Sequence, residues 1–197
     1  MIDVATGKDV ADVAEKVVAA KRVGKTSLTI GTVIFNLTEW GYCDRFVREC
    51  HEAATGEAEQ SWPYRAKTAK ITRGMLAAAG LAVTDRQRGD VVCFRFEPYG
   101  HIAIWLGGGM VAENTSSATR GEPREKGHKV TPLASIGESR IVGWFRPLPA
   151  VAVLAPPQFE QAWQWAKDMG LVNTMDYDPT VGRMLEILRR YAKATNL

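Results

Sequence analysis

The 197-residue sequence has only three cysteines, and their odd number argues against a full disulfide framework. No two cysteines form a CxxC pair, and the three histidines do not show the spacing of metal ligands, so we expect no zinc site. A calcium loop of the EF-hand type is also missing. We therefore expect a protein that works without a metal ion or another cofactor.

Three other kinds of segment are missing. No run of 18 or more apolar residues occurs, so we expect no insertion into a membrane. Residues 1–4 lack the basic and apolar regions that open a Sec signal, so we expect synthesis in the cytoplasm without one. No basic run is interleaved with aromatic residues, which argues against nucleic-acid binding. The net charge of +3 favours contact with an anionic polymer or surface without requiring nucleic acid.

The chain does contain enough apolar material for a core, since 46% of its residues are hydrophobic and 24% are charged. Its length allows one ordinary domain with a small appendage, and we expect a monomer. A Pro/Ala/Val-rich stretch marks the boundary. We expect a domain over residues 1–148, a linker over 149–157 and a helical hairpin over 158–197.

The spacing of apolar residues changes from helical to strand periodicity along the domain. Helices are expected over residues 9–21, 43–54 and 66–79, and strands over 91–96, 101–106, 110–114 and 140–146. Residues 26–35 fit a strand or a buried helical turn equally well. The polar, charged stretch over 115–129 indicates an exposed loop. This order predicts an α+β fold in which N-terminal helices pack on an antiparallel sheet.

Residues 40–50 have the pattern of a helix that begins at a cysteine. Cys43, Phe46, Val47 and Cys50 fall on one helical face. The free N–H groups at a helix N-terminus carry positive partial charge and favour a thiolate. Cys43 is therefore a candidate nucleophile. The alternative for the same pattern is a buried structural cysteine.

A cysteine nucleophile needs a base and a residue that orients the base. His101 opens a strand directly after a tight turn, which makes it the best candidate base among the three histidines. The orienting residue should come from the next strand. A two-residue turn would pair His101 with Asn114, whereas a three-residue turn would place Glu113 on the His101 face. We favour Glu113 and keep Asn114 as the alternative.

Aromatic residues cluster around the candidate nucleophile. Trp40, Tyr42 and Trp62 could line a groove for an extended substrate. The alternative is that these side chains belong to the core, and for aromatic residues that alternative is the more common one.

Several ordered motifs together resemble the NlpC/P60 and CHAP branches of the papain-like peptidoglycan hydrolases. They are Cys43-x-x-Phe46-Val47, Gly89-Asp90-Val91-Val92-x-Phe94, Gly100-His101-Ile102-Ala103-Ile104-x-Leu106-Gly107 and Ile141-Val142-Gly143-Trp144-Phe145-Arg146-Pro147. The resemblance implies a papain-like fold, with Cys43 as nucleophile, His101 as base and acid, and Glu113 or Asn114 as orienting residue. Tyr42 stands where CHAP members carry glutamine, so the backbone N–H of Cys43 is the expected oxyanion donor.

The resemblance also implies a function and a place of action. We expect a cysteine peptidase or amidase that cleaves an amide bond in peptidoglycan, in a stem peptide or at the junction of sugar and peptide. Without a Sec signal, the enzyme would reach the cell wall as a phage lysin or as an injected effector. The alternative is an inactive module of the same fold that binds the wall or a partner. The helical tail is similar to cell-wall modules of lytic enzymes, or it only packs on the domain.

Overall fold

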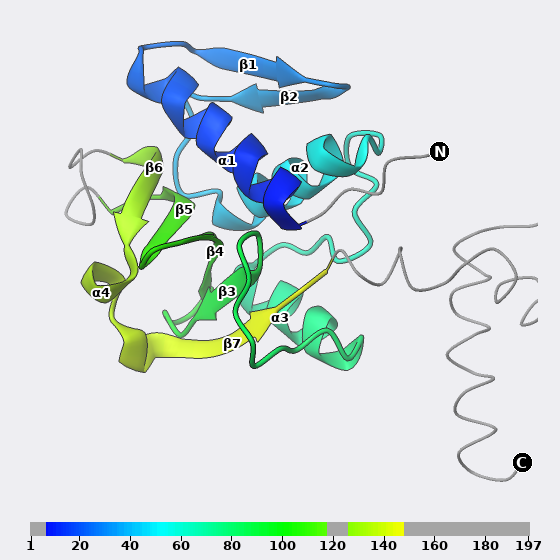
Figure 1. The fold of residues 1–197 in the computed structure, drawn as a ribbon, viewed down its shortest axis with the longest axis vertical. Helices are drawn as coiled ribbons and strands as arrows, with labels where there is room; N and C mark the ends of the chain where they lie inside the picture. The colour runs from blue at the N-terminus through cyan, green and yellow to red at the C-terminus, as the bar shows by residue number, and fades with distance from the viewer. Residues whose placement is uncertain (1–6, 118–125, 148–197) are drawn as a thin grey trace, which may run out of the picture. The chain divides into compact units, whose positions relative to one another are not determined.

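The computed structural model describes residues 7–117 and 126–147. These belong to the first of the two units into which the chain divides, Met1–Pro149. The expected linker over 149–157 and the helical region over 158–197 lie outside the described residues. Within the described part, helices α1 to α4 and seven strands form an α+β domain (Figure 1). The fold class expected from the sequence is confirmed at this level.

The helices and strands follow the expected order along the chain. The helices are α1 (Gly7–Arg22), α2 (Cys43–Thr55), α3 (Ala69–Ala78) and α4 (Leu133–Ile136), and a short 3-10 helix covers Glu138–Arg140. The strands are β1 (Ser27–Ile30), β2 (Val33–Asn36), β3 (Val91–Phe94), β4 (His101–Gly107), β5 (Met110–Thr115), β6 (Gly127–Pro132) and β7 (Ile141–Phe145).

The strands form two antiparallel sheets. Strands β1 and β2 make a separate hairpin, which resolves the open question over residues 26–35 in favour of strands. The main sheet has the order β6-β5-β4-β3-β7, and all its neighbours are antiparallel. Its centre is the expected meander β3-β4-β5, so the start of β4 and the end of β5 lie at the same end of the sheet.

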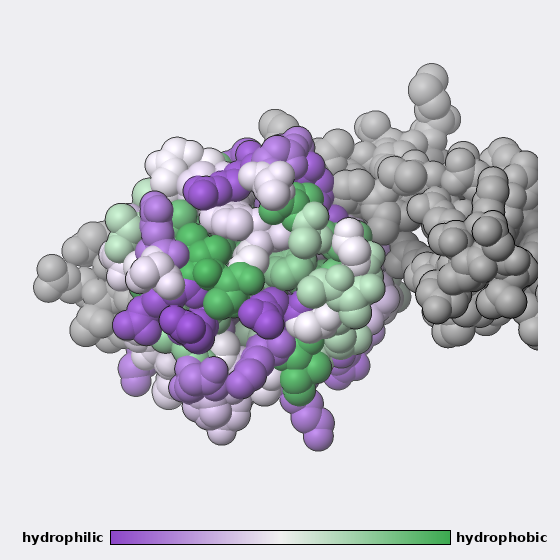
Figure 2. All heavy atoms as spheres, turned by 90° about the horizontal axis from the view of Figure 1, so that it is seen from below, coloured by the Kyte–Doolittle hydropathy of each residue, from purple (hydrophilic) through white to green (hydrophobic). Residues whose placement is uncertain are grey.

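Each face of the main sheet has its own apolar cluster. Ile102 and Ile104 of β4 pack with Phe46 and Val47 of α2, and both α1 and α2 contact β4 and β5. On the opposite face, Ala103 packs in a second cluster that α4 helps to cover. The period-two alternation along β4 therefore separates the helix-covered core from the other face. From below, hydrophobic residues lie among hydrophilic ones on the domain surface (Figure 2).

The expectation of an exposed loop through residue 129 is wrong for its last part. Residues from Gly127 onward form strand β6, which pairs with β5. His128 and Lys129 are buried there despite their polarity. The Lys129 ammonium donates a hydrogen bond to the Ser117 carbonyl at 2.9 Å, which offsets the cost of its burial. Nε2 of His128 lies 3.0 Å from Nδ2 of Asn114, whereas its Nδ1 has no hydrogen-bond partner among the described residues. The polar composition of this segment is therefore why the sequence predicted a loop where the structure has a strand.

Candidate active site

Helix α2 begins at Cys43, as expected. Gly41 adopts a left-handed φ of 82°, a conformation that glycine adopts without steric cost and that turns the chain into the helix. The N-cap residue Tyr42 makes no side-chain capping bond, so the first N–H groups of α2 have no capping side chain. The helix thus presents a thiol beside uncapped backbone donors.

His101 is the first residue of β4, and the turn before it is held against α3. Gly100 has a φ of 74°, and a Cβ at this position would lie 3.0 Å from the backbone nitrogen of Lys70. The same nitrogen donates a hydrogen bond to the Tyr99 carbonyl at 2.9 Å. Because the turn and the start of α3 touch at backbone level, the position of His101 is fixed by both.

The pairing of β4 with β5 selects Glu113 as the neighbour of His101. Ile104 pairs with Ala112 and Trp105 with Val111, a register that places Glu113 on the same face of the sheet as His101. This is the register that the sequence favoured. The turn itself differs from the expectation, because Gly107 pairs with Met110 and the extra residue is taken up as an irregularity at Leu106.

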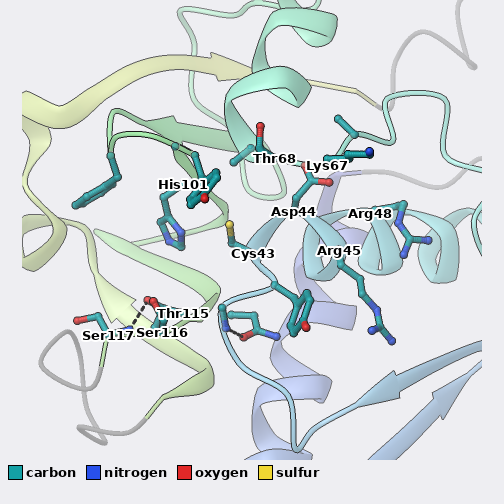
Figure 3. Close-up of a pocket in the computed structure, with 18 of the residues that line it drawn as sticks. Cys43, Asp44, Arg45, Arg48, Lys67, Thr68, His101, Thr115, Ser116 and Ser117 are labelled. Atoms are coloured by element: carbon teal, nitrogen blue, oxygen red, sulfur yellow. Dashed lines mark hydrogen bonds between the residues drawn. The ribbon is translucent and has the colours of Figure 1, made fainter.

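His101 lies between a thiol and a carboxylate. Its Nε2 is 2.5 Å from Oε2 of Glu113, and both His101 and Cys43 line the same groove. Cys43 and His101 face each other across the site (Figure 3). The second oxygen of Glu113 accepts a hydrogen bond from the Thr131 hydroxyl at 2.6 Å. The carboxylate is fully buried, and its two oxygens are thereby held in place.

The protonation of His101 follows from these contacts. Burial alone lowers the pKa of His101, but the interactions with Cys43 and Glu113 outweigh burial and raise that pKa to about 9. The imidazole therefore carries a proton at neutral pH. A protonated imidazole beside a thiol favours the thiolate and provides an acid for a leaving group.

Asn114, the alternative orienting residue, has another role. Its Oδ1 accepts a hydrogen bond from the Gly41 N–H at 3.0 Å, and its Nδ2 lies 3.0 Å from Nε2 of His128. Burial, with smaller effects of Lys21 and Arg45, lowers the pKa of His128 to about 4, so its neutral ring can accept this bond. Asn114 thus fixes the backbone just before Cys43.

An open groove of about 840 Å³ runs past Cys43 and His101. Its wall includes Asn114 and the segment Thr115 to Ser117 at the end of β5 on one side, and residues around the start of α3 on the other (Figure 3). A groove of this size can hold a small molecule or a short stretch of a longer chain.

Of the three aromatic residues expected at the groove, one lines it. Tyr42 is 53% exposed and forms part of the wall. Trp62 is only 6% exposed and stacks on His51, with ring centroids 5.3 Å apart, so it does not line the groove and has the core position given as the alternative. Its indole buries a large apolar area in the main core, which is the common fate of tryptophan.

Trp40 is also outside the groove, although it is half exposed. Its ring is covered by the Lys126 ammonium, which lies 4.2 Å from the ring centroid. The structure thus does not place Trp40 in the groove wall. The sequence did not predict the contact of Thr131 with Glu113 or that of His128 with Asn114. Both Thr131 and His128 lie on or beyond the segment expected to be a loop.

Among residues 7–117 and 126–147, no group of three or more histidine, cysteine, aspartate or glutamate side chains is placed to hold a metal ion. Within the same residues, no helix has the length and apolar character needed to cross a membrane.

The three cysteines differ sharply in accessibility, which predicts their reactivity. Burial raises the pKa of the Cys50 and Cys93 thiols, and both are almost inaccessible. Cys43 lines the groove beside a protonated His101. We expect iodoacetamide to alkylate Cys43 at least about 100-fold faster than the other two, as measured by peptide mass spectrometry over time. Equal rates for all three would contradict this geometry.

We compared the chain with protein-family models and with curated proteins. No family model matches it, and no curated protein is a significant match.

Proposed function

We propose that this protein is a thiol hydrolase that cleaves an amide bond, with Cys43 as nucleophile, His101 as acid and base, and Glu113 as orienting residue. The observation that carries the proposal is the position of His101, which faces Cys43 on one side and is hydrogen-bonded to Glu113 on the other. A nucleophile, a base and an oriented third group at the wall of a groove form the arrangement that covalent acyl transfer needs.

The reaction would proceed in two stages. The Cys43 sulfur, with its proton on His101, attacks the amide carbon, and His101 returns a proton to the departing amine. This leaves a thioester between the acyl group and Cys43. Water, activated by the now neutral His101, then attacks the thioester and releases a carboxylic acid, which restores the thiol.

Charge that develops on the amide oxygen needs donors. The helix N-terminus at Cys43 has no capping side chain, so its N–H groups are available to the oxygen of an amide that Cys43 attacks. Backbone donors in such a position stabilise an oxyanion without reorganisation during the reaction. Tyr42, which replaces the usual glutamine of the CHAP branch, lines the same wall.

We further propose that the fold is papain-like and that the substrate is bacterial peptidoglycan. Support comes from the ordered motifs around Cys43 and His101, and from the open groove that both residues line. The cleaved bond would be in a stem peptide or at the muramoyl–alanine junction. A phage lysin or an injected effector fits this substrate.

Purified peptidoglycan provides the test. The protein should lower the turbidity of a sacculus suspension, and mass spectrometry of the soluble fragments should find new amine and carboxyl ends at one type of bond. Fragments cut at sugar linkages, or binding to the sacculus without any fragments, would contradict the proposed hydrolase.

A further inference from the structure

The charged side chains that line the groove are almost all of one sign. One carboxylic residue, Asp44, lies in the wall, and burial raises its pKa. The cationic residues in the wall are Arg45, Arg48, Arg65, Lys67 and Arg140. An open groove with this lining attracts anionic ligands.

Two of these cations already have carboxylate partners. Arg45 contacts Glu39 at 2.7 Å and Glu49 at 2.6 Å. Arg48 contacts the buried Glu52 at 3.0 Å. These ion pairs stabilise helix α2 and the segment before it. They also largely neutralise the charges of Arg45 and Arg48.

Arg65 and Lys67 differ from that pair. Among the described residues, neither has a carboxylate partner, and the one hydrogen bond of the Arg65 side chain goes to the neutral Gln60 amide at 2.8 Å. Both residues are exposed and come from the short segment before α3. Arg140 is positioned otherwise, since its guanidinium lies 4.7 Å from the Phe96 ring centroid.

The position of Lys67 relative to the reacting groups indicates on which side of Cys43 the acyl part of the substrate would lie. In Figure 3, Cys43 lies between His101 on one side and Asp44 and Lys67 on the other. The departing amine must lie near His101 to receive its proton. An acyl part that extends from Cys43 away from His101 would run toward the segment that carries Lys67 and Arg65.

We propose that the acyl part of the substrate carries a carboxylate, which Arg65 and Lys67 bind. This inference rests on the thiol hydrolase proposed above and specifies its substrate. In a peptide, the group would be a free side-chain or α-carboxylate on the acyl side of the cleaved amide. The binding is electrostatic. The Lys67 ammonium is a point charge on a flexible side chain, and the Arg65 guanidinium is a planar group with several N–H donors.

The rate of alkylation of Cys43 tests the electrostatic potential at the nucleophile without any substrate. Rate constants for iodoacetate and iodoacetamide are measured on the wild type and on the double variant Arg65→Glu/Lys67→Glu, and their ratio removes differences in thiol reactivity. We expect the ratio to fall about fivefold in the double variant at low salt, and less at high salt. The matched control is Lys16→Glu/Lys25→Glu, which changes the net charge equally at exposed positions outside the groove wall. The control should keep the wild-type ratio.

Peptidoglycan with modified carboxylates tests the substrate itself. Amidation of the stem-peptide carboxylates with carbodiimide and ammonia should raise KM for the wild type about tenfold or more, and should have little effect on the double variant. An unchanged iodoacetate ratio in the double variant, or equal KM for native and amidated peptidoglycan, would overturn the carboxylate site. Failure of the hydrolase would look different, because no fragments would then appear from either substrate.

Discussion

Replacing Cys43 with alanine should reduce fragment release from peptidoglycan by at least about 10⁴-fold, because removing the nucleophile of a covalent mechanism leaves only binding and oxyanion stabilisation. Cys43 has a partly exposed side chain, so the substitution should leave the domain folded. The measurement is the initial rate of fragment release by mass spectrometry, with circular dichroism as the check on folding.

A second cysteine in the same helix provides the matched control. Cys50 lies seven residues later on α2 and is fully buried in the core. Cys50→Ala should lower the stability of the domain by removing buried volume, but should retain most of the activity below its melting temperature. Activity in Cys43→Ala close to that of Cys50→Ala would contradict a nucleophilic role for Cys43.

The second large effect is expected at Glu113. Glu113→Gln keeps the size of the side chain and an acceptor for the Thr131 hydroxyl, but removes the negative charge beside His101. We expect kcat to fall about 10²- to 10⁴-fold, because the imidazolium and its orientation lose their partner. Asn114→Ala removes the hydrogen bond from the Gly41 N–H and should lower kcat only about fivefold to tenfold. A larger loss in Asn114→Ala than in Glu113→Gln would reverse the assignment.

The pH profile gives Glu113→Gln a signature that loss of stability does not produce. The pKa of His101 is raised to about 9, with Glu113 among the causes. The wild-type rate should therefore fall as pH rises through about 9, where His101 loses its proton. In Glu113→Gln this fall should begin at lower pH. The raised pKa also stabilises the fold below about pH 6.5, and that stabilisation is lost as pH rises through about 9.

Periodicity and turn chemistry predicted the parts of the site that local sequence controls. The helical face shared by Cys43 and Phe46 placed the cysteine at the start of α2, and the alternation along β4 placed His101 and Ala103 on one face. The choice of Glu113 followed from the register of one hairpin. These features depend on residues close together in the sequence, which is why the sequence alone could resolve them.

The features that the sequence missed depend on contacts between distant residues. His128 reads as part of a charged loop, yet it is buried because Asn114 of the neighbouring strand meets its ring. For Trp62 the sequence allowed the groove or the core, and the contact with His51 places it in the core. Composition describes a residue's own preference, whereas burial depends on which partners the fold supplies.

The central claim is that Cys43 forms a covalent bond with the acyl part of the substrate. The most direct test is to mix the protein with peptidoglycan fragments, quench with acid during turnover and map the protein by mass spectrometry. We expect an added mass on the peptide that contains Cys43, equal to the acyl product minus water, and no such mass in Cys43→Ala. Fragment release with no adduct on Cys43, together with an active Cys43→Ala variant, would contradict the account.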